Sequence, residues 1–490
     1  MKPISRLWSL LIAAFLAIPA PGQPALIERA QAMVKAGNAK DAIPILLDLY
    51  RDRPRDANLC QQIGIAYTQL EDLANAERFY REAVRLEPGF WAARKNLATV
   101  LWFLDRKDES QHEFLAVTTA LPTDPVPHLY LGLAAFGQRR YPAARVHFDK
   151  AGALALDNPE TLPAVVETYL QTRDRSVPSR VVHHMVEAQN PDLDLLSRIG
   201  ELLLQHGDYD LAALTLERLT SARLESAEAW RMLAAAYAGQ NKPEPAYRAY
   251  SRAVEAAPNA AEPYVELAEF ASSHGNNDYA GQVVEQGLRQ LPRSPELLFE
   301  KGILLALKGD RSGAEASFKE ASRAKPAWNL PWMALGVTQL ESGDAKQAIA
   351  TLKKARDADP SDPRGHYLYA TALSKEAGPD AGKGRSEAMG ALRKATELDP
   401  NDSRSYALLG QLQLAAGETA GAEAELRTAL KIEPENTTAL YQLGLLLRKQ
   451  GKAEEAHRVL DKFEKVKAQK HAEEESLVQI LKVVPGTRTP

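Results

Sequence analysis

The sequence has very little cysteine and almost no net charge. Cys60 is the single cysteine among 490 residues, so the chain cannot form an intramolecular disulfide and must be held together by packing. A small buried apolar residue is the expected role of this side chain. The formal charge is only -4, with both signs mixed along the chain and no basic block that could follow a phosphate backbone. We therefore expect no nucleic-acid partner.

Motifs for catalysis and metal binding are also missing. The patterns HExxH, CxxC and GxSxG and the glycine-rich dinucleotide fingerprint do not occur. The stretch GPDAGKG at 378–384 only superficially resembles a phosphate loop, because its glycines are too close and Gly384 replaces the required Ser or Thr. His183 and His184 are adjacent on an expected helix, so they point about 100° apart and do not form a chelating pair. We expect no catalytic residues, no cofactor and no metal site.

Long apolar runs are confined to the N-terminus. Two cations in MKPISR precede the twelve-residue run LWSLLIAAFLAI, and the small residues Ala20 and Gly22 follow it. This order is typical of a secretory signal peptide that is cleaved after Gly22. An uncleaved anchor is the alternative, but the run is shorter than the roughly 20 residues that span a bilayer. We expect residues 1–22 to be removed and the mature chain to be exported, to the periplasm or outside the cell, without membrane insertion.

A 34-residue period runs through the rest of the chain. Thirteen units begin at residues 23, 57, 91, 125, 159, 193, 227, 261, 295, 329 and 363 and, after a six-residue insertion, at 403 and 437. Place 8 of the unit is Gly or Ala in twelve units, place 20 is Ala in eleven, and place 32 is Pro in nine. Places 4, 7, 8 and 11 form one apolar stripe and places 20, 24 and 27 form another, which predicts two helices per unit.

The same places explain how each pair of helices packs and ends. Small residues at 8, 20 and 27 let the two backbones approach, while large residues at 4, 11 and 24 fill the space beside them. Proline at place 32 ends the second helix. Glycine at place 15 supplies the left-handed cap of the first helix. It is present in seven units, as Gly37, Gly207, Gly275, Gly309, Gly343, Gly417 and Gly451.

A helical hairpin of this size cannot bury its own apolar face, so neighbouring units must stack. The pattern resembles the tetratricopeptide repeat family, and the resemblance covers nearly the whole mature chain. It implies an all-α fold, a right-handed α-solenoid of about thirteen 34-residue hairpins. Unit five departs from the pattern at Val166 and Pro178, so its second helix should start late or kink. The expected organisation is a signal peptide (1–22), units one to four (23–158), a softer joint (159–192), units six to thirteen with a loop insertion near 376–387 (193–470), and a capping helix with a tail (471–490).

The resemblance implies a binding surface on the concave side, at places 2, 5, 9, 12 and 13 of the first helices. A clamp for the C-terminal carboxylates of chaperones, known in one subclass, is rejected because units one and two offer Ile27, Gln31, Gln61 and Ile65 at the clamp positions. Units three, four, nine and ten are instead mainly apolar there. The expected partner-binding residues are Lys95, Thr99, Trp102, Phe103, Leu129, Leu133, Phe136, Phe299, Ile303, Met333 and Val337. The alternative is that Trp102 leans across to Leu133 and closes the strip of units three and four internally.

Three functions can be compared on this basis. The first is an exported, non-catalytic scaffold or adaptor that binds a protein or peptide. The second is a dedicated assembly factor of a cell-envelope machine, for polysaccharide export or outer-membrane assembly. The third, an enzyme, would need a catalytic domain for which the repeats leave no room. Asn401 and Asn436 would accept glycans on a eukaryotic export route and are otherwise turn residues between repeats.

Overall fold

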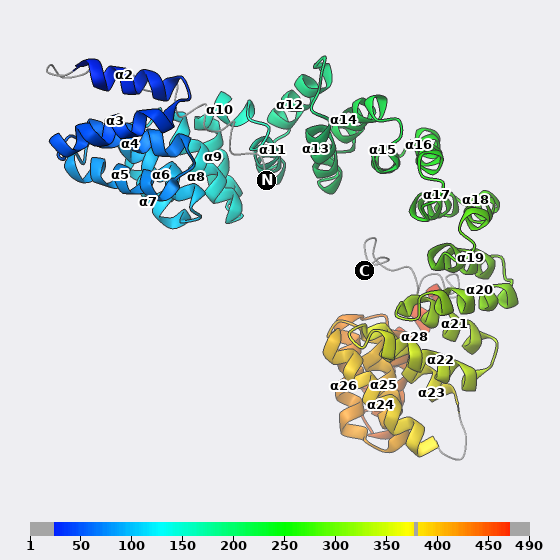
Figure 1. The fold of residues 1–490 in the computed structure, drawn as a ribbon. Coiled ribbons are helices and arrows are strands. Elements are labelled where there is room, and N and C mark those ends of the chain that lie inside the picture. Colours follow the sequence, from blue (N-terminus) through cyan, green and yellow to red (C-terminus); the bar gives the residue numbers. More distant parts are fainter. Residues whose placement is uncertain (1–23, 377–380, 471–490) are drawn as a thin grey trace. The chain divides into compact units, whose positions relative to one another are not determined.

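The computed structural model describes residues 24–376 and 381–470, and all regular secondary structure within these residues is α-helical (Figure 1). The expected α-solenoid of helical hairpins is confirmed. The helices are α2 (Pro24–Lys35), α3 (Ala39–Asp52), α4 (Ala57–Gln69), α5 (Leu73–Leu86), α6 (Trp91–Phe103), α7 (Lys107–Ala120), α8 (Pro125–Gly137), α9 (Tyr141–Ala151), α10 (Ala153–Leu156), α11 (Leu162–Gln171), α12 (Ser176–Glu187), α13 (Leu193–Gln205), α14 (Tyr209–Ala222), α15 (Ala227–Gly239), α16 (Pro243–Ala256), α17 (Glu262–Ser273), α18 (Asn277–Gln290), α19 (Pro295–Leu307), α20 (Arg311–Ala324), α21 (Asn329–Glu341), α22 (Ala345–Ala358), α23 (Pro363–Lys375), α24 (Ala381–Leu398), α25 (Ser403–Ala416), α26 (Thr419–Ile432), α27 (Thr437–Lys449) and α28 (Ala453–Lys470).

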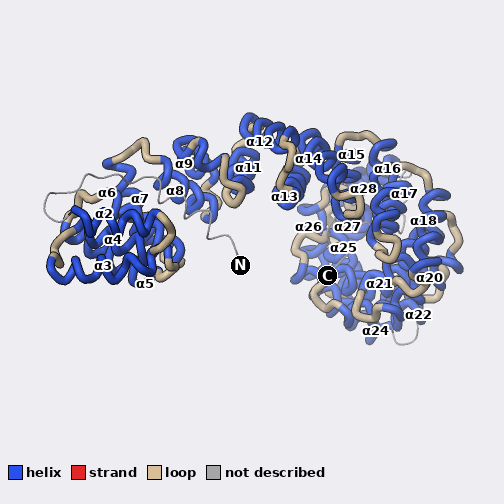
Figure 2. The backbone as a smooth tube through the Cα atoms, turned by 45° about the horizontal axis from the view of Figure 1, so that its top comes forward, coloured by secondary structure: helices blue, strands red, loops and turns tan. Residues whose placement is uncertain are grey.

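The chain forms two compact units. The first contains the described residues up to Leu224 together with Met232–Ala246, and the second contains Glu225–Arg231 and the described residues from Tyr247 onward. Within each unit, helices joined by short turns follow one another as hairpins (Figure 2). The division falls in repeat seven, which is later than the joint expected at 159–192.

The close approach expected at place 8 is present in the hairpins. A Cβ atom added to Gly336 would lie 2.4 Å from Cγ of Leu352, and one added to Gly302 would lie 2.4 Å from the ring of Phe318. Carbon atoms in ordinary contact are about 3.5–4.0 Å apart, so only glycine fits beside these large residues at place 24. The same pairing occurs at Gly64 and Tyr80, Gly132 and Phe148, Gly200 and Leu216, Gly410 and Leu426, and Gly444 and Leu460.

The left-handed turn at place 15 is confirmed at all seven expected glycines, with Gly37 and Gly417 both at φ +84°. Five residues other than glycine adopt the same left-handed conformation at place 15 of their repeats. The sequence pattern did not reveal this feature. A left-handed backbone costs an L-residue about 1–2 kcal/mol, so packing of the hairpin enforces the turn at these positions. The five residues are Glu71, Asp105, Arg139, Arg173 and Asn241, with φ between 56° and 60°.

Side-chain caps begin many of the described helices, a feature that was not expected from the sequence. Asp56 accepts a hydrogen bond from the N–H of Leu59 at 3.0 Å, and Asp72 accepts one from Asn75 at 3.1 Å. Each bond satisfies a backbone donor that the first turn leaves free. Equivalent caps at places 34 and 16 are Asp124, Asp192, Ser294, Asp362, Asp402 and Asn436 for first helices, and Asp208, Asn276, Asp310 and Asp344 for second helices.

The proline at place 32 has a second role. Its carbonyl accepts a hydrogen bond from the side chain at place 4 of the next repeat, as from Trp332 Nε1 to Pro326 at 3.0 Å. His128 Nε2 donates in the same way to Pro122 at 3.0 Å, which leaves its Nδ1 as an acceptor. That Nδ1 lies 3.0 Å from Nδ1 of His147, so one proton is shared between the two imidazoles. Each such bond ties a repeat to the one before it.

Repeat five is irregular, and the disturbance begins before it. Gly152 turns left-handed at φ +55° and separates α9 from the short α10. Helix α12 starts at Ser176, one residue later than second helices elsewhere, and Pro178 lies in its first turn, where proline is tolerated. The expected late start is confirmed. Val166 is fully buried, and place 24 holds the small Val182, which is also fully buried. The softer joint expected at 159–192 stays a prediction.

The expected loop near 376–387 is partly wrong. Helix α24 begins at Ala381, so residues 381–387 are helical and only residues 376–380 remain between α23 and α24, of which 377–380 lie outside the described residues. Residues 381–398 are rich in alanine, lysine, arginine and glutamate, which favour helix. The signal peptide (1–22) and the capping helix and tail (471–490) also lie outside the described residues.

Two smaller expectations concern single side chains. Cys60 is fully buried, and burial raises the pKa of its thiol to about 11. It packs against Ala83 and Ala93, as a small core residue would. Asn436 caps α27 and donates from Nδ2 to Ser403 Oγ at 3.2 Å, so it acts as a residue of the turn between repeats.

Candidate functional site

Most of the partner-binding residues expected from the sequence are core residues. Lys95 is buried and its Nζ lies 2.6 Å from Asp124 Oδ2, while Thr99 donates to the carbonyl of Lys95 at 3.0 Å. The prediction that these side chains face a partner is therefore wrong for seven positions, because the stripe through places 5 and 9 packs within the solenoid. The seven are Lys95, Thr99, Leu129, Phe299, Ile303, Met333 and Val337.

The other four, Trp102, Phe103, Leu133 and Phe136, are partly exposed. Trp102 and Leu133 pack against one hydrophobic cluster, and the Trp102 ring meets Tyr130 edge-on at 5.3 Å. Lys107 Nζ covers the Trp102 ring at 3.9 Å from its centroid, a cation–π contact. These contacts favour internal closure of the strip over an open binding surface.

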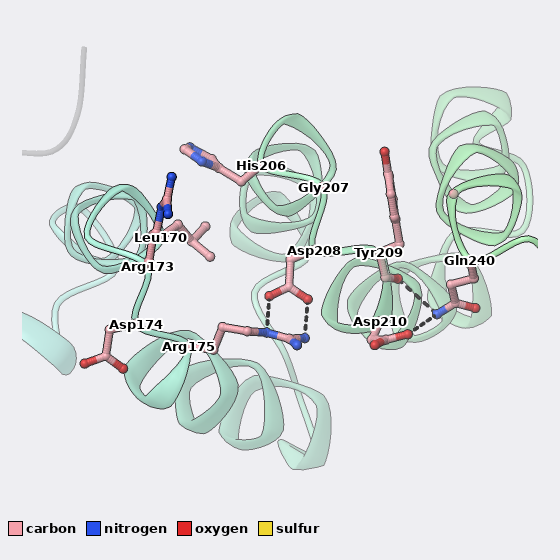
Figure 3. Close-up of a pocket in the computed structure, with 11 residues that line it drawn as sticks. Leu170, Arg173, Asp174, Arg175, His206, Gly207, Asp208, Tyr209, Asp210 and Gln240 are labelled. Atoms are coloured by element: carbon pink, nitrogen blue, oxygen red, sulfur yellow. Dashed lines mark hydrogen bonds and ion pairs between the residues drawn. The ribbon is translucent and has the colours of Figure 1, made fainter.

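A pocket of about 500 Å³ lies on the first compact unit, where the turns of three consecutive repeats come together (Figure 3). We call it the turn pocket. Its walls come from the α11–α12 turn of repeat five, the α13–α14 turn of repeat six and the end of α15 in repeat seven. The lining residues are Leu170, Arg173, Asp174, Arg175, His206, Gly207, Asp208, Tyr209, Asp210, Gly239 and Gln240.

Specific bonds hold the three turns in place. Arg175 forms two parallel bonds with Asp208, at 2.7 and 2.5 Å, and so joins repeat five to repeat six. Gln240 Nε2 donates to the carbonyl of Tyr209 and to Asp210, both at 3.1 Å, and joins repeat seven to repeat six. The Tyr209 ring lies against Gly239, where a Cβ atom would come within 2.4 Å of it. The walls are thus fixed by contacts between repeats.

Other polar groups in the turn pocket are not engaged in this way. Within the described chain, the side chains of Arg173, His206 and Tyr209 make no hydrogen bond or ion pair. Asp174, by contrast, accepts from the N–H of Ser176 at 2.8 Å and pairs with Arg145 at 2.5 Å. Its bonds with Ser176, together with the Arg145 cation, hold the pKa of Asp174 below its usual value.

The sequence analysis missed this site. Repeat five was noted for its helix packing, and the turns were considered only for the glycine at place 15. The available signal was the succession of Arg173, Asp174 and Arg175 at the same places as Gly207, Asp208 and Tyr209 one repeat later, with His206 directly before them. Periodicity shows that such residues share one edge of the array, but it does not show which of them pair.

No group of three or more His, Cys, Asp or Glu side chains in the described chain could hold a metal ion. His183 and His184 are both exposed, and His183 Nδ1 bonds the carbonyl of Ser179 at 2.7 Å. Among the described helices, none is long and apolar enough to cross a membrane.

Comparison with known families agrees with the repeat register. Tetratricopeptide repeat families match five segments that together make up about half of the chain. The segments are 57–90, 198–261, 305–372, 391–424 and 413–472. The chain belongs to the tetratricopeptide repeat family.

Individual relatives are distant. The BBSome complex member BBS4 of Bos taurus is 22% identical over 331 residues, which are 65% of this chain and 62% of that protein. The match thus spans less than two thirds of that relative. Yeast Tom70 is 15% identical, with a TM-score of 0.39 over 94% of this chain and 99% of that chain. YrrB, a TPR protein with an unusual peptide-binding site, is 21% identical, with a TM-score of 0.34 over 40% of this chain and 97% of that chain.

Proposed function

We propose that this protein is an exported, non-catalytic scaffold that binds an extended segment of a partner protein. The observation that carries the proposal is the turn pocket, because its walls come from three consecutive repeats. A segment crossing such a pocket would contact several repeats at once, which is how a solenoid gathers affinity without a deep cavity. The pocket volume also lies within the roughly 300–1,000 Å³ typical of binding pockets.

The exposed tyrosine of the turn pocket is the anchor in this proposal. Tyr209 keeps 37% of its surface exposed although its ring is fixed against Gly239. Aromatic side chains that are rigid and half-exposed carry much of the binding energy at protein interfaces. Membership of the tetratricopeptide repeat family supports protein binding in general, and the pocket supports this particular place.

Export rests on the sequence of residues 1–22, with its cations, apolar run and small residues. The intact mass of protein recovered from the periplasm or the medium tests it. A mature chain beginning at Gln23 is expected, and retention of residues 1–22 on the exported protein would contradict it.

The binding proposal is tested by capture from an envelope fraction, followed by reconstitution of the captured protein with the purified chain. Tyr209→Ala should weaken the reconstituted complex at least tenfold, since truncating an anchor typically costs about 2 kcal/mol or more. Tyr441→Ala, which removes a tyrosine that is 43% exposed on α27, is the matched control and should bind normally. Equal binding by the two variants would show that the turn pocket is not the site.

A further inference from the structure

We propose that the turn pocket takes a carboxylate group of the bound segment. This inference rests on the proposed function and adds the chemistry of the group recognised. Three side chains in the pocket, those of Arg173, His206 and Tyr209, can donate hydrogen bonds and have no partner in the described chain. A ligand that satisfies Arg173 and His206 together must offer several acceptor atoms, and a carboxylate offers two oxygens with about four acceptor sites.

The position of the donors fits this chemistry. Figure 3 shows the Arg173 guanidinium and the His206 imidazole projecting on the same side of the turns, while the Tyr209 ring rises from the start of α14, in the same repeat as His206, with its hydroxyl at the tip. Arg173 is exposed and His206 is half-buried. A planar guanidinium binds a carboxylate through two parallel bonds, which makes Arg173 the primary contact.

The carboxylates of the pocket itself do not occupy these donors. Asp208 is buried and held by both arms of Arg175, and Asp174 is held by Ser176 and Arg145. Asp210 accepts from Gln240 and lies beyond Tyr209 from Arg173 in Figure 3. The negative charges are thus engaged in joining the turns, whereas the cation at Arg173 remains available.

The carboxylate could come from an acidic side chain or from a chain terminus, and three labelled peptides separate these sources. Hexaglutamate with an amidated C-terminus carries only side-chain carboxylates. Hexaglutamine with a free C-terminus carries only the terminal carboxylate, and hexaglutamine amide carries neither. Fluorescence anisotropy with the full chain at low salt gives the dissociation constants, and at least one of the first two peptides should bind tenfold more tightly than the third.

Arg173→Gln keeps a polar side chain and removes its charge. It should weaken binding of the carboxylate peptide about tenfold, because the paired bonds of a guanidinium to a carboxylate are stronger than hydrogen bonds between neutral groups. The matched control is Arg139→Gln, since Arg139 is exposed at the same place of repeat four and has the same left-handed backbone, with φ 56° against 58°. Circular dichroism checks that both variants remain folded.

The outcomes separate this inference from the proposed function. If Arg173→Gln and Arg139→Gln bind the carboxylate peptides equally, or if neither peptide binds better than hexaglutamine amide, the carboxylate assignment is overturned. Capture of a partner that depends on Tyr209 would still support the scaffold. Conversely, loss of peptide binding in Arg173→Gln alone supports the carboxylate site even if no partner is captured.

Discussion

The contact between Gly336 and Leu352 gives the sharpest test of how the hairpins pack. A Cβ atom on Gly336 would lie 2.4 Å from Leu352 Cγ and 2.6 Å from Cδ2, about 1 Å inside ordinary contact. Leu352 is fully buried in a hydrophobic cluster of the second compact unit, so it has little room to move. Inserting a methyl group into such a site costs about 1–3 kcal/mol.

Gly336→Ala also removes a glycine from a helix, which by itself stabilises by about 1 kcal/mol. Gly390→Ala isolates this second effect, because Gly390 is exposed on α24 and has no atom within 4 Å of the added Cβ. Packing therefore predicts that Gly336→Ala is less stable than Gly390→Ala by about 1–3 kcal/mol. The free energy of unfolding in guanidinium chloride measures the difference.

Hydrogen exchange at α21 and α22 should show the loss at the same place, as faster exchange in Gly336→Ala than in the unchanged chain. A double-mutant cycle with Leu352→Ala completes the test, because truncating Leu352 removes the clashing atoms and should make Gly336→Ala harmless. The reasoning is refuted if Gly336→Ala stabilises the protein as much as Gly390→Ala does.

Three further predictions concern other parts of the chain. Arg139→Gly should raise the free energy of unfolding by about 1 kcal/mol, since glycine adopts the left-handed turn without strain. An unchanged melting temperature in thermal denaturation would contradict this prediction. Burial, the neighbouring His128 and nearby cations lower the pKa of His147. The folded state then binds fewer protons, so stability falls as the pH drops below the unfolded value of about 6.5. His147→Gln should lose less stability than the unchanged chain between pH 8 and pH 5 in denaturant titrations, and an identical pH dependence would count against the argument. Trp102→Ala should lower the free energy of unfolding by roughly 2 kcal/mol because the half-buried ring packs on Tyr130, and partner capture should stay unchanged. Lost capture with unchanged stability would instead support an open binding surface at Trp102.

The sequence by itself determined the architecture of this protein. The spacing of small and large residues identified two helices per repeat, and Gly302 and Gly336 lie against the large residues at place 24 as that spacing requires. The glycines at place 15 turn left-handed as predicted. These features follow from contacts within one hairpin, and the chain repeats the pattern thirteen times, so each unit confirms the reading of the others.

Only the tertiary structure decided which exposed positions remain available for binding. Phe299 and Met333 lie on a second apolar stripe, and the sequence could not show that this stripe is buried as well. Arg175 and Asp208 are 33 residues apart and meet because adjacent repeats stack, while Arg173 makes no hydrogen bond or ion pair within the described part of the chain. A period of 34 residues gives the place of each side chain within its repeat, but pairing between repeats depends on the local geometry of their packing, and the irregular repeat five changes that geometry where the pocket forms.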